Sequence, residues 1–312
     1  MTRQQWEQLV CVTRGEAHDG TPVGFIIDSP WLPGWAGEQI VDYLAGDSVW
    51  MECNLKATER FPEAIFLPGF WAEYGMCTEP SAFGSKPVFP RNQFPYPSKL
   101  LRSAGEVEHL SVPDVRADGL LPLVISRLSR LRPQIVESGH DIYFATSRGP
   151  LNIAAYLMGT TEFLMALKLE PRAVHSLLAI ITEFISNWLA YQRECFLSID
   201  GVFLLDDIVG MIGSDDFLEF ANPYFSRLYG EHDVSVKFFH NDAPCEISAP
   251  YYAGWGVNLY NPGIQSTISE ILELTGAKVT ILGNIPPRDV LAAASPAEVA
   301  ETTHTLLTSH GN

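Results

Sequence analysis

The sequence predicts an α/β fold, because short apolar segments alternate with helical patterns along the whole chain. The apolar segments are rich in β-branched and aromatic residues, and their apolar residues follow one another directly instead of alternating with polar ones. Such segments are typical of parallel strands that are covered on both faces. They are residues 22–28, 64–70, 141–147, 202–208, 236–242, 257–262 and 279–285. We therefore expect seven strands in a single domain that spans residues 1–312.

Segments with helical periodicity or helix start signals lie between the predicted strands. The segment 170–197 begins with Glu170-Pro171 and has apolar residues at three- and four-residue spacing. Ser214-Asp215-Asp216 precedes a second helix, where serine or aspartate can cap the exposed amides, and Ser295-Pro296 opens the last helix. The proline-rich segment 78–116 has weak periodicity, so we expect a long excursion over the surface.

Composition limits the class of partner and the compartment. With 20 Lys+Arg against 37 Asp+Glu, the chain has a net charge of −17, which argues against nucleic acid or an anionic membrane as the main partner. The five cysteines are scattered without a CxxC pair, which favours a reduced, intracellular protein. No signal-peptide core is evident, and no apolar run approaches the ~20 residues of a membrane helix. We therefore expect a cytoplasmic protein that acts on a small molecule.

Polar residues end most of the predicted strands. In a (β/α)8 barrel these ends converge on one mouth, where side chains from different strands meet. Adjacent strand residues point to opposite faces, so at most one of Asp206 and Asp207 should face the barrel axis. Burial would raise a carboxyl pKa toward the range of general acid chemistry, which makes this pair the catalytic candidates. The strand-end residues are Asp28, Asp206, Asp207, His240, Asp242, Asn261 and Asn284.

Several ordered motifs in the later part of the chain resemble the uroporphyrinogen decarboxylase superfamily. They are G-P-L-N-I-A-A-Y-L-M-G (149–159), L-E-P-R-A-V-H-S-L-L (169–178), D-G-V-F-L-L-D-D-I (200–208), F-L-E-F-A-N-P-Y (217–224) and L-G-N-I-P-P-R-D-V-L (282–291). The chain resembles the zinc-dependent, corrinoid-linked methyltransferase branch more closely than the decarboxylases. The resemblance covers about residues 140–300 and, more loosely, 1–75. It implies a TIM-type (β/α)8 barrel with its site at the C-terminal mouth.

The segment after the first strand departs from the decarboxylases. Those enzymes carry P-V-W-x-M-R-Q-A-G-R, whose arginines hold the carboxylates of the porphyrinogen. Here the matching segment, residues 22–37, is P-V-G-F-I-I-D-S-P-W-L-P-G-W-A-G, so both arginines are absent and Asp28 stands nearby. A carboxylate that faces a polyanion costs energy. Porphyrinogen decarboxylation is therefore not the predicted activity.

The methyltransferase relatives bind zinc through a His-x-Cys motif and a later cysteine. The resemblance places His240 at the motif histidine and Asp242, a harder donor that zinc also accepts, at the motif cysteine. Cys245 could supply sulfur if the turn folds back. The alternatives are that Asp242 caps the next helix and that Cys245 is a buried apolar thiol. The resemblance also implies a corrinoid on a partner protein, and a homodimer.

The barrel lacks one element of the family pattern. The chain ends at T-S-H-G-N, after the helix that follows the seventh strand. An open barrel would leave two strand edges unpaired. We therefore expect that the eighth strand is missing, as in a fragment, or is supplied otherwise, by a partner subunit.

The expected substrate-binding residues at the mouth are Asp28, Trp31, Phe70, Asn261 and Asn284.

The resemblance implies an enzyme that moves a methyl group from a small methylated compound, such as a methoxylated aromatic, to the corrinoid. Zinc, or Asp242 with His240, would polarise the leaving heteroatom, and Asp206 or Asp207 would supply the proton. Two alternatives stay open. One is a decarboxylase of a small carboxylated substrate, and the other is a non-catalytic barrel that binds a ligand or assembles with a partner.

Overall fold

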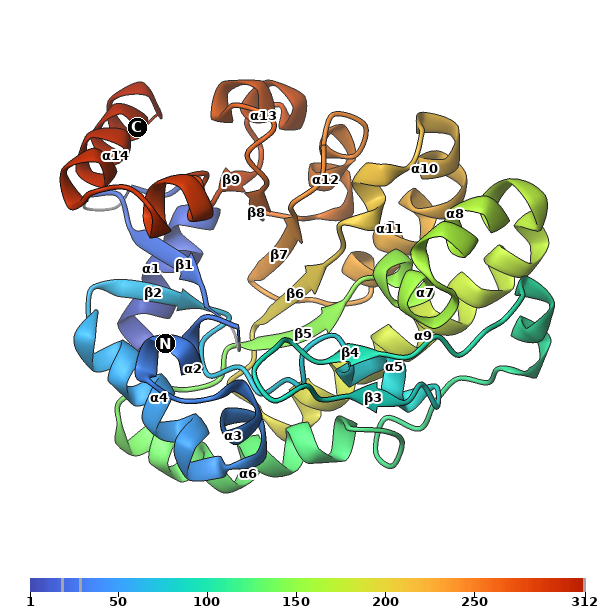
Figure 1. Ribbon diagram of the computed structural model, residues 1–312. Coiled ribbons are helices and arrows are strands. Elements are labelled where there is room, and N and C mark those ends of the chain that lie inside the picture. Colours follow the sequence, from blue (N-terminus) through green and yellow to red (C-terminus); the bar gives the residue numbers. More distant parts are fainter. Residues whose placement is uncertain (18–19, 28–29, 311–312) are drawn as a thin grey trace.

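The computed structural model describes residues 1–17, 20–27 and 30–310, and it contains the predicted strands in the predicted order (Figure 1). All seven apolar segments form parallel strands, which confirms the α/β assignment. They are β1 (Val23–Ile26), β2 (Ala64–Leu67), β5 (Phe144–Arg148), β6 (Gly201–Leu205), β7 (Val236–Asn241), β8 (Leu259–Pro262) and β9 (Thr280–Ile281).

The strands form two parallel sheets. Strands β5 to β9 pair in sequence order as one five-stranded sheet, and β1 pairs with β2. The register aligns Arg148, Leu205, His240 and Asn261 at one level, near the C-terminal ends of four neighbouring strands. In the described residues no ladder joins β2 to β5 or β9 to β1. The barrel is therefore incomplete, in agreement with the predicted absence of an eighth strand.

Alternation along the strands separates an inner from an outer core. Phe144, Phe203 and Phe238 belong to the inner core, and the rings of Phe203 and Phe238 stack with centroids 4.2 Å apart. Helix α1 (Arg3–Thr13) contributes Trp6, whose ring stacks on Tyr143 at 4.9 Å and meets the edge of Phe144. Helix α1 thus covers the inner core near the N-terminal ends of β5 and β6.

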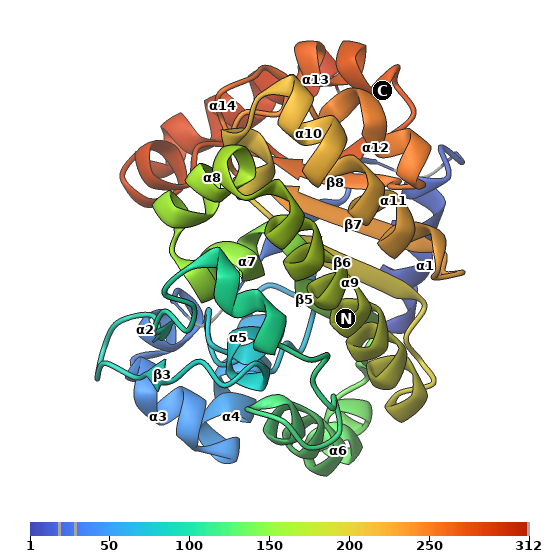
Figure 2. The same cartoon turned by 90° about the vertical axis from the view of Figure 1, so that its right-hand side faces the viewer.

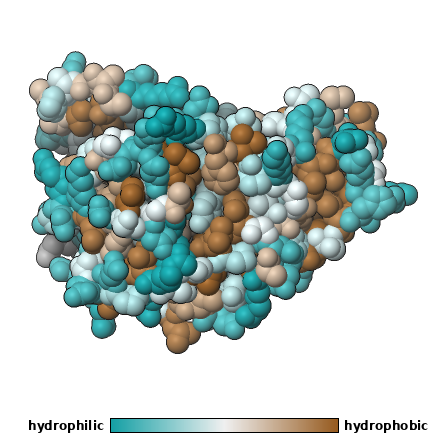
Figure 3. Space-filling view, turned by 60° about the horizontal axis from the view of Figure 1, so that its bottom comes forward, coloured by the Kyte–Doolittle hydropathy of each residue, from teal (hydrophilic) through white to brown (hydrophobic). Residues whose placement is uncertain are grey.

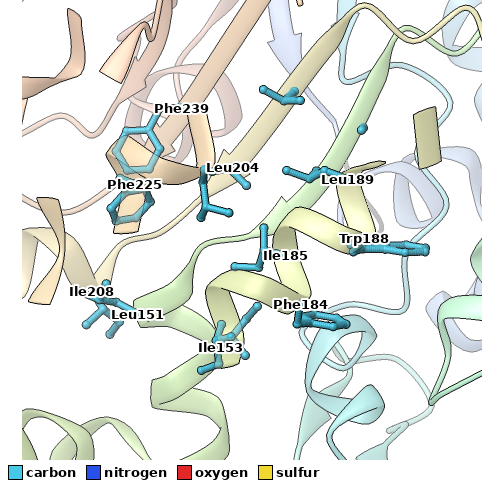
Figure 4. Close-up of a cluster of buried hydrophobic side chains, with 14 of the residues drawn as sticks. Leu151, Ile153, Phe184, Ile185, Trp188, Leu189, Leu204, Ile208, Phe225 and Phe239 are labelled. Carbon is cyan, nitrogen blue, oxygen red and sulfur yellow. The ribbon is translucent and has the colours of Figure 1, made fainter. Parts of the chain in front are cut away.

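The outer core lies between the strands and the surrounding helices. Helix α9 (Pro171–Cys195) runs along the sheet (Figure 2), and its residues Phe184, Ile185 and Trp188 belong to the same buried cluster as Leu151 and Ile153 of α7 (Pro150–Met158) in the close-up of Figure 4. In the described chain α9 is the one helix long and apolar enough to cross a membrane by length and composition. Half of its most apolar stretch is buried in the protein, so α9 is a core helix of the barrel.

Shorter helices form the rest of the outer layer around the strands. The surface seen in Figure 3 carries apolar residues in several patches, with hydrophilic residues between them. The helices are α2 (Leu32–Ala36), α3 (Ile40–Ala45), α4 (Asp47–Arg60), α5 (Thr78–Ala82), η1 (Ala104–His109), α6 (Leu121–Glu137), α8 (Thr160–Leu169), η2 (Ile208–Met211), α10 (Ser214–Phe220), α11 (Asn222–Gly230), α12 (Ala249–Trp255), α13 (Ile268–Thr275), η3 (Pro287–Ala292) and α14 (Pro296–His310).

Two sequence predictions need correction. The helix expected after Ser214 is two helices, α10 and α11, because Pro223 has no amide to donate and starts the second helix in its first turn. Helix α10 also begins at Ser214 itself, after Gly213 and without a side-chain cap. The excursion 78–116 does not lie wholly on the surface, because its first five residues form the buried helix α5. It also contains η1 and the short hairpin of β3 (Pro87–Val88) and β4 (Tyr96–Pro97).

The tight inner core gives a test of the packing. A Cβ on Gly201 would lie 2.7 Å from the Phe144 ring and 3.1 Å from the Trp6 ring. We expect Gly201→Ala to lower the free energy of unfolding by about 1–3 kcal/mol, the usual cost of overpacking. The control is Gly230→Ala at the end of α11, where a Cβ would meet no atom within 4 Å. Urea unfolding would contradict this packing if the two variants lost the same stability.

Candidate active site at the strand ends

Polar side chains from four strands meet at the C-terminal ends of the sheet, a region that we call the mouth. It comprises Arg148 on β5, Asp207 after β6, His240 on β7 and Asn261 on β8, together with Trp71 after β2. Arg148, His240 and Asn261 share one level of the register and follow the inward-facing positions of their strands. The strand alternation therefore brings together residues that lie far apart in the sequence.

His240 is held in one orientation by Asn261. The side-chain amide Nδ2 of Asn261 donates to the carbonyl oxygen of Leu282 at 2.6 Å, so its Oδ1 faces Nδ1 of His240 at 2.7 Å. Because Oδ1 can only accept, Nδ1 of His240 carries a proton and donates it. Nε2 is then the ring atom that can gain or lose a proton at the mouth. Oδ2 of Asp242 lies 3.7 Å from Nε2.

A buried ion cluster lies at the same level and was missed in the sequence. Nη2 of Arg148 donates to Oε2 of Glu73 at 2.8 Å, and Nη1 lies 3.5 Å from Oε2 of Glu79. Oε1 of Glu79 also accepts the backbone N–H of Arg148 at 3.0 Å. All three side chains are at least nine-tenths buried. Burial alone would lower the pKa of Arg148, but the charges of Glu73 and Glu79 outweigh it and raise that pKa above its usual range.

Tyr156 on α7 is a second residue that the sequence did not single out. Burial raises the pKa of its phenol to about 12, the positive charge of Arg148 opposes that rise, and the negative charges of Asp207 and Glu79 add to it. The phenol therefore stays protonated near neutral pH and can donate a hydrogen bond. Tyr156 lies on α7, which begins directly after β5 at the mouth side of the sheet.

The adjacent aspartates have different roles, as the alternation predicts. Asp206 is fully buried on the outer side, where its Oδ2 accepts the N–H groups of Leu151 and Asn152 at 2.8 and 3.0 Å. It thus caps the N-terminus of α7. Asp207 lies at the mouth, and its Oδ1 accepts the backbone N–H of Asp242 at 2.8 Å. Of the two catalytic candidates, the structure places Asp207 at the mouth and Asp206 beneath it.

The expected substrate-binding residues are only partly at the mouth. Asp28 lies outside the described residues. Trp31 is 42% exposed and stacks on Trp35, and Phe70 packs in the outer core against Trp50 and His140. The next residue, Trp71, belongs to the inner core and lies near both Phe203 and Arg148.

The two asparagines are fixed by the backbone. Asn261 reaches the mouth through its contact with His240. Asn284 is engaged elsewhere, because its Nδ2 donates to the carbonyl oxygens of Gly263 and Ser266 at 3.1 and 3.0 Å. Asn284 therefore joins the β8–α13 and β9–η3 connections, and its amide donors are not directed to a ligand.

The expected zinc ligands do not come together. The described residues contain no group of three or more His, Cys, Asp or Glu side chains placed to hold a metal ion. The turn after β7 carries Cys245 into the outer core, where burial raises the pKa of its thiol while the Tyr260 and Ser266 side chains oppose that rise. His240 and Asp242 remain near each other at the mouth without the sulfur ligand. The residues present therefore do not fit the zinc site that the resemblance implies, and Cys245 is a buried thiol.

The fold and the mouth define an α/β-barrel protein with its candidate site at the C-terminal ends of the strands. The sequence profile of the family "Uroporphyrinogen decarboxylase (URO-D)" matches residues 36–312. The chain therefore belongs to the URO-D family.

Relatives carry the same family name, and a solved structure shares the fold. The chain is 24% identical to a uroporphyrinogen decarboxylase of Xanthomonas campestris pv. campestris (strain B100), over 95% of this chain and 86% of the relative. It is 25% identical to the uroporphyrinogen decarboxylase of Azotobacter vinelandii, over 90% and 82%. A methyltransferase from Methanosarcina mazei has the same fold, with a TM-score of 0.80 and 17% identity over 98% of this chain and 90% of that chain.

The burial of Asp206 predicts a pH dependence of stability. Burial raises the pKa of its carboxyl from 3.8 to about 8. The hydrogen bond from the backbone N–H of Asn152 opposes this rise, and repulsion from the charge of Asp207 adds to it. Between these values the folded protein holds a proton that the unfolded chain has released, so its stability falls as the pH rises from about 4 to about 8. The slope from this residue is at most about 1.4 kcal/mol per pH unit.

The variant Asp206→Asn isolates this contribution, because it keeps an oxygen that accepts the N–H groups of α7 but cannot ionise. We expect the difference in unfolding free energy between the variant and the wild type to shift in favour of the variant as the pH rises from 5 to 8. Urea unfolding at four pH values measures this difference. Parallel pH profiles for the two proteins would contradict the assignment.

Proposed function

We propose that this protein is a methyltransferase that moves a methyl group from a small methylated compound to a corrinoid carried by a separate protein. The observation that carries the proposal is the orientation of His240, whose Nδ1–H is fixed by Asn261 so that Nε2 is available at the mouth. The fold that it shares with a methyltransferase from Methanosarcina mazei supports the same class of reaction.

Cleavage of the heteroatom–methyl bond of an uncharged donor, such as a methyl ether, leaves an anion unless the heteroatom takes a proton, whereas a methylated ammonium or sulfonium leaves as a neutral group and needs none. In an uncharged donor the electron pair of that bond stays on the heteroatom, which takes a proton from Nε2 of the His240 imidazolium. The corrinoid, as the second substrate, supplies the reduced cobalt that accepts the methyl group. Asn261 keeps the ring in place during the transfer, and Asp242 lies beside the Nε2 edge.

Apolar side chains of the inner core form the floor of the mouth below His240, which suits an uncharged or aromatic group above them. Trp71 and Phe203 lie next to each other in the inner core, with ring centroids 6.0 Å apart. Tyr156 supplies a protonated phenol that can hold a polar atom of the methyl donor. Arg148 is already paired with two carboxylates, which argues against a porphyrinogen as the substrate.

Substitution of His240 tests the proposal. In an assay that transfers methyl groups from methoxylated aromatics, methylated amines or thioethers to free cob(I)alamin, we expect His240→Gln to lower kcat by about 10²- to 10⁴-fold, the usual contribution of a general acid. Asn261→Leu should give a smaller loss, because the ring remains but is no longer oriented. The control is His304→Gln on the exposed face of α14, which should leave the rate unchanged.

Two results of these assays would contradict the proposal. Lack of methyl transfer from every donor class would discard the proposal, and so would full activity of His240→Gln. Release of carbon dioxide from a small carboxylated compound without any corrinoid would point instead to a decarboxylase.

A further inference from the structure

The buried charges at the mouth are not balanced. Glu73 and Glu79 together carry two negative charges against the single positive charge of Arg148. Asp207 and Asp242 add further carboxylates at the mouth, next to each other and to His240. The described side chains of the mouth therefore carry an excess of negative charge.

Two carboxylates of the protein already face the guanidinium of Arg148. Nη2 is bonded to Glu73 and Nη1 faces Glu79, and the ring of Trp71 lies 5.9 Å from the guanidinium carbon. An arginine that binds a carboxylate ligand needs a free pair of N–H groups for the bidentate contact. Here two carboxylates of the protein itself lie beside the guanidinium, and their negative charges oppose the approach of a third.

We propose that Glu73 and Glu79 determine the charge of the ligand: by neutralising Arg148, they make the mouth accept uncharged or cationic ligands and reject carboxylates. This inference rests on the mouth being the ligand site, as in the proposed function, and it narrows the class of methyl donor. An approaching carboxylate meets repulsion in a site of low dielectric, whereas a methylated ammonium or sulfonium is attracted. Aromatic rings such as Trp71 add to the attraction for a cation.

The variant Glu79→Gln tests the inference with little change of shape. In the wild type the backbone N–H of Arg148 donates to Oε1 of Glu79. The glutamine keeps an oxygen that can accept this hydrogen bond, and the substitution removes one negative charge. The control is Glu7→Gln on α1, where Glu7 pairs with the exposed Arg3 on a different element from those that form the mouth. Both variants change the net charge of the protein by the same amount, so their difference reports the position of the charge.

The probes are benzene-1,3,5-tricarboxylate, phenyltrimethylammonium and neutral benzamide, each titrated by calorimetry. We expect Glu79→Gln to bind the tricarboxylate at least tenfold more tightly than either the wild type or Glu7→Gln does, with benzamide affinity unchanged. A gain in Glu79→Gln no larger than that in Glu7→Gln would overturn the inference. Glu73→Gln is the second variant, with the same expectation, in case Glu79→Gln does not fold.

The wild-type protein gives a test that needs no variant. It should bind phenyltrimethylammonium at least tenfold more tightly than the tricarboxylate, and equal or reversed affinities would overturn the inference. The methyl-transfer assay is separate from these titrations. If the charge selection holds but no donor is demethylated, the proposed function fails and the inference stands. If methyl transfer occurs without charge selection, the inference fails alone.

Discussion

The free edge of β5 sets the main constraint on this structure. In the described residues β5 pairs with β6 on one side only, yet its other edge faces β2 and is buried, so its backbone groups need other partners. The side-chain amide of Gln192 bonds both the N–H and the carbonyl oxygen of Thr146, at 3.0 and 2.9 Å. Glu79 accepts the N–H of Arg148, and in the segment that leads into β5 the carbonyl oxygen of Met1 accepts the N–H of Asp141. Side chains and the first residue thus replace a neighbouring strand.

The same edge explains why an ion cluster is buried at the mouth. Glu79 must approach β5 to satisfy the N–H of Arg148, and its charge then requires a cation nearby, which the Arg148 side chain provides. Glu73 joins from the segment after β2, so the cluster ties β2 to β5 where no ladder does. Removing one member of a buried ion pair costs about 3–5 kcal/mol, because the remaining charge stays buried. The cluster therefore links the closure of the barrel to the charge of the candidate site.

Much of this arrangement could be predicted from the sequence, and the failures have physical reasons. The strands were predictable because runs such as V-F-L-L are apolar on both faces, and period-2 alternation correctly separated Asp206 from Asp207. Arg148 was missed although it directly follows a predicted strand, because its partners Glu73 and Glu79 lie 75 and 69 residues away in the sequence. For Cys245 the sequence left a zinc ligand and a buried apolar thiol both open, because the path of a turn after a strand depends on what the core accepts. In this protein the outer core takes the thiol.

Family membership and chemistry can separate in this protein because different residues control them. The outward-facing residues of the strands, such as Val202 and Phe239, pack against the helices and keep the barrel. The inward-facing strand ends carry the charge of the mouth, and they can change without loss of the fold. Positive charge is removed in two independent places: the segment 30–37 contains no arginine, and Arg148 is neutralised by two glutamates. In our proposal, a barrel of the URO-D family thus keeps its frame while the charge of its mouth disfavours a carboxylated ligand.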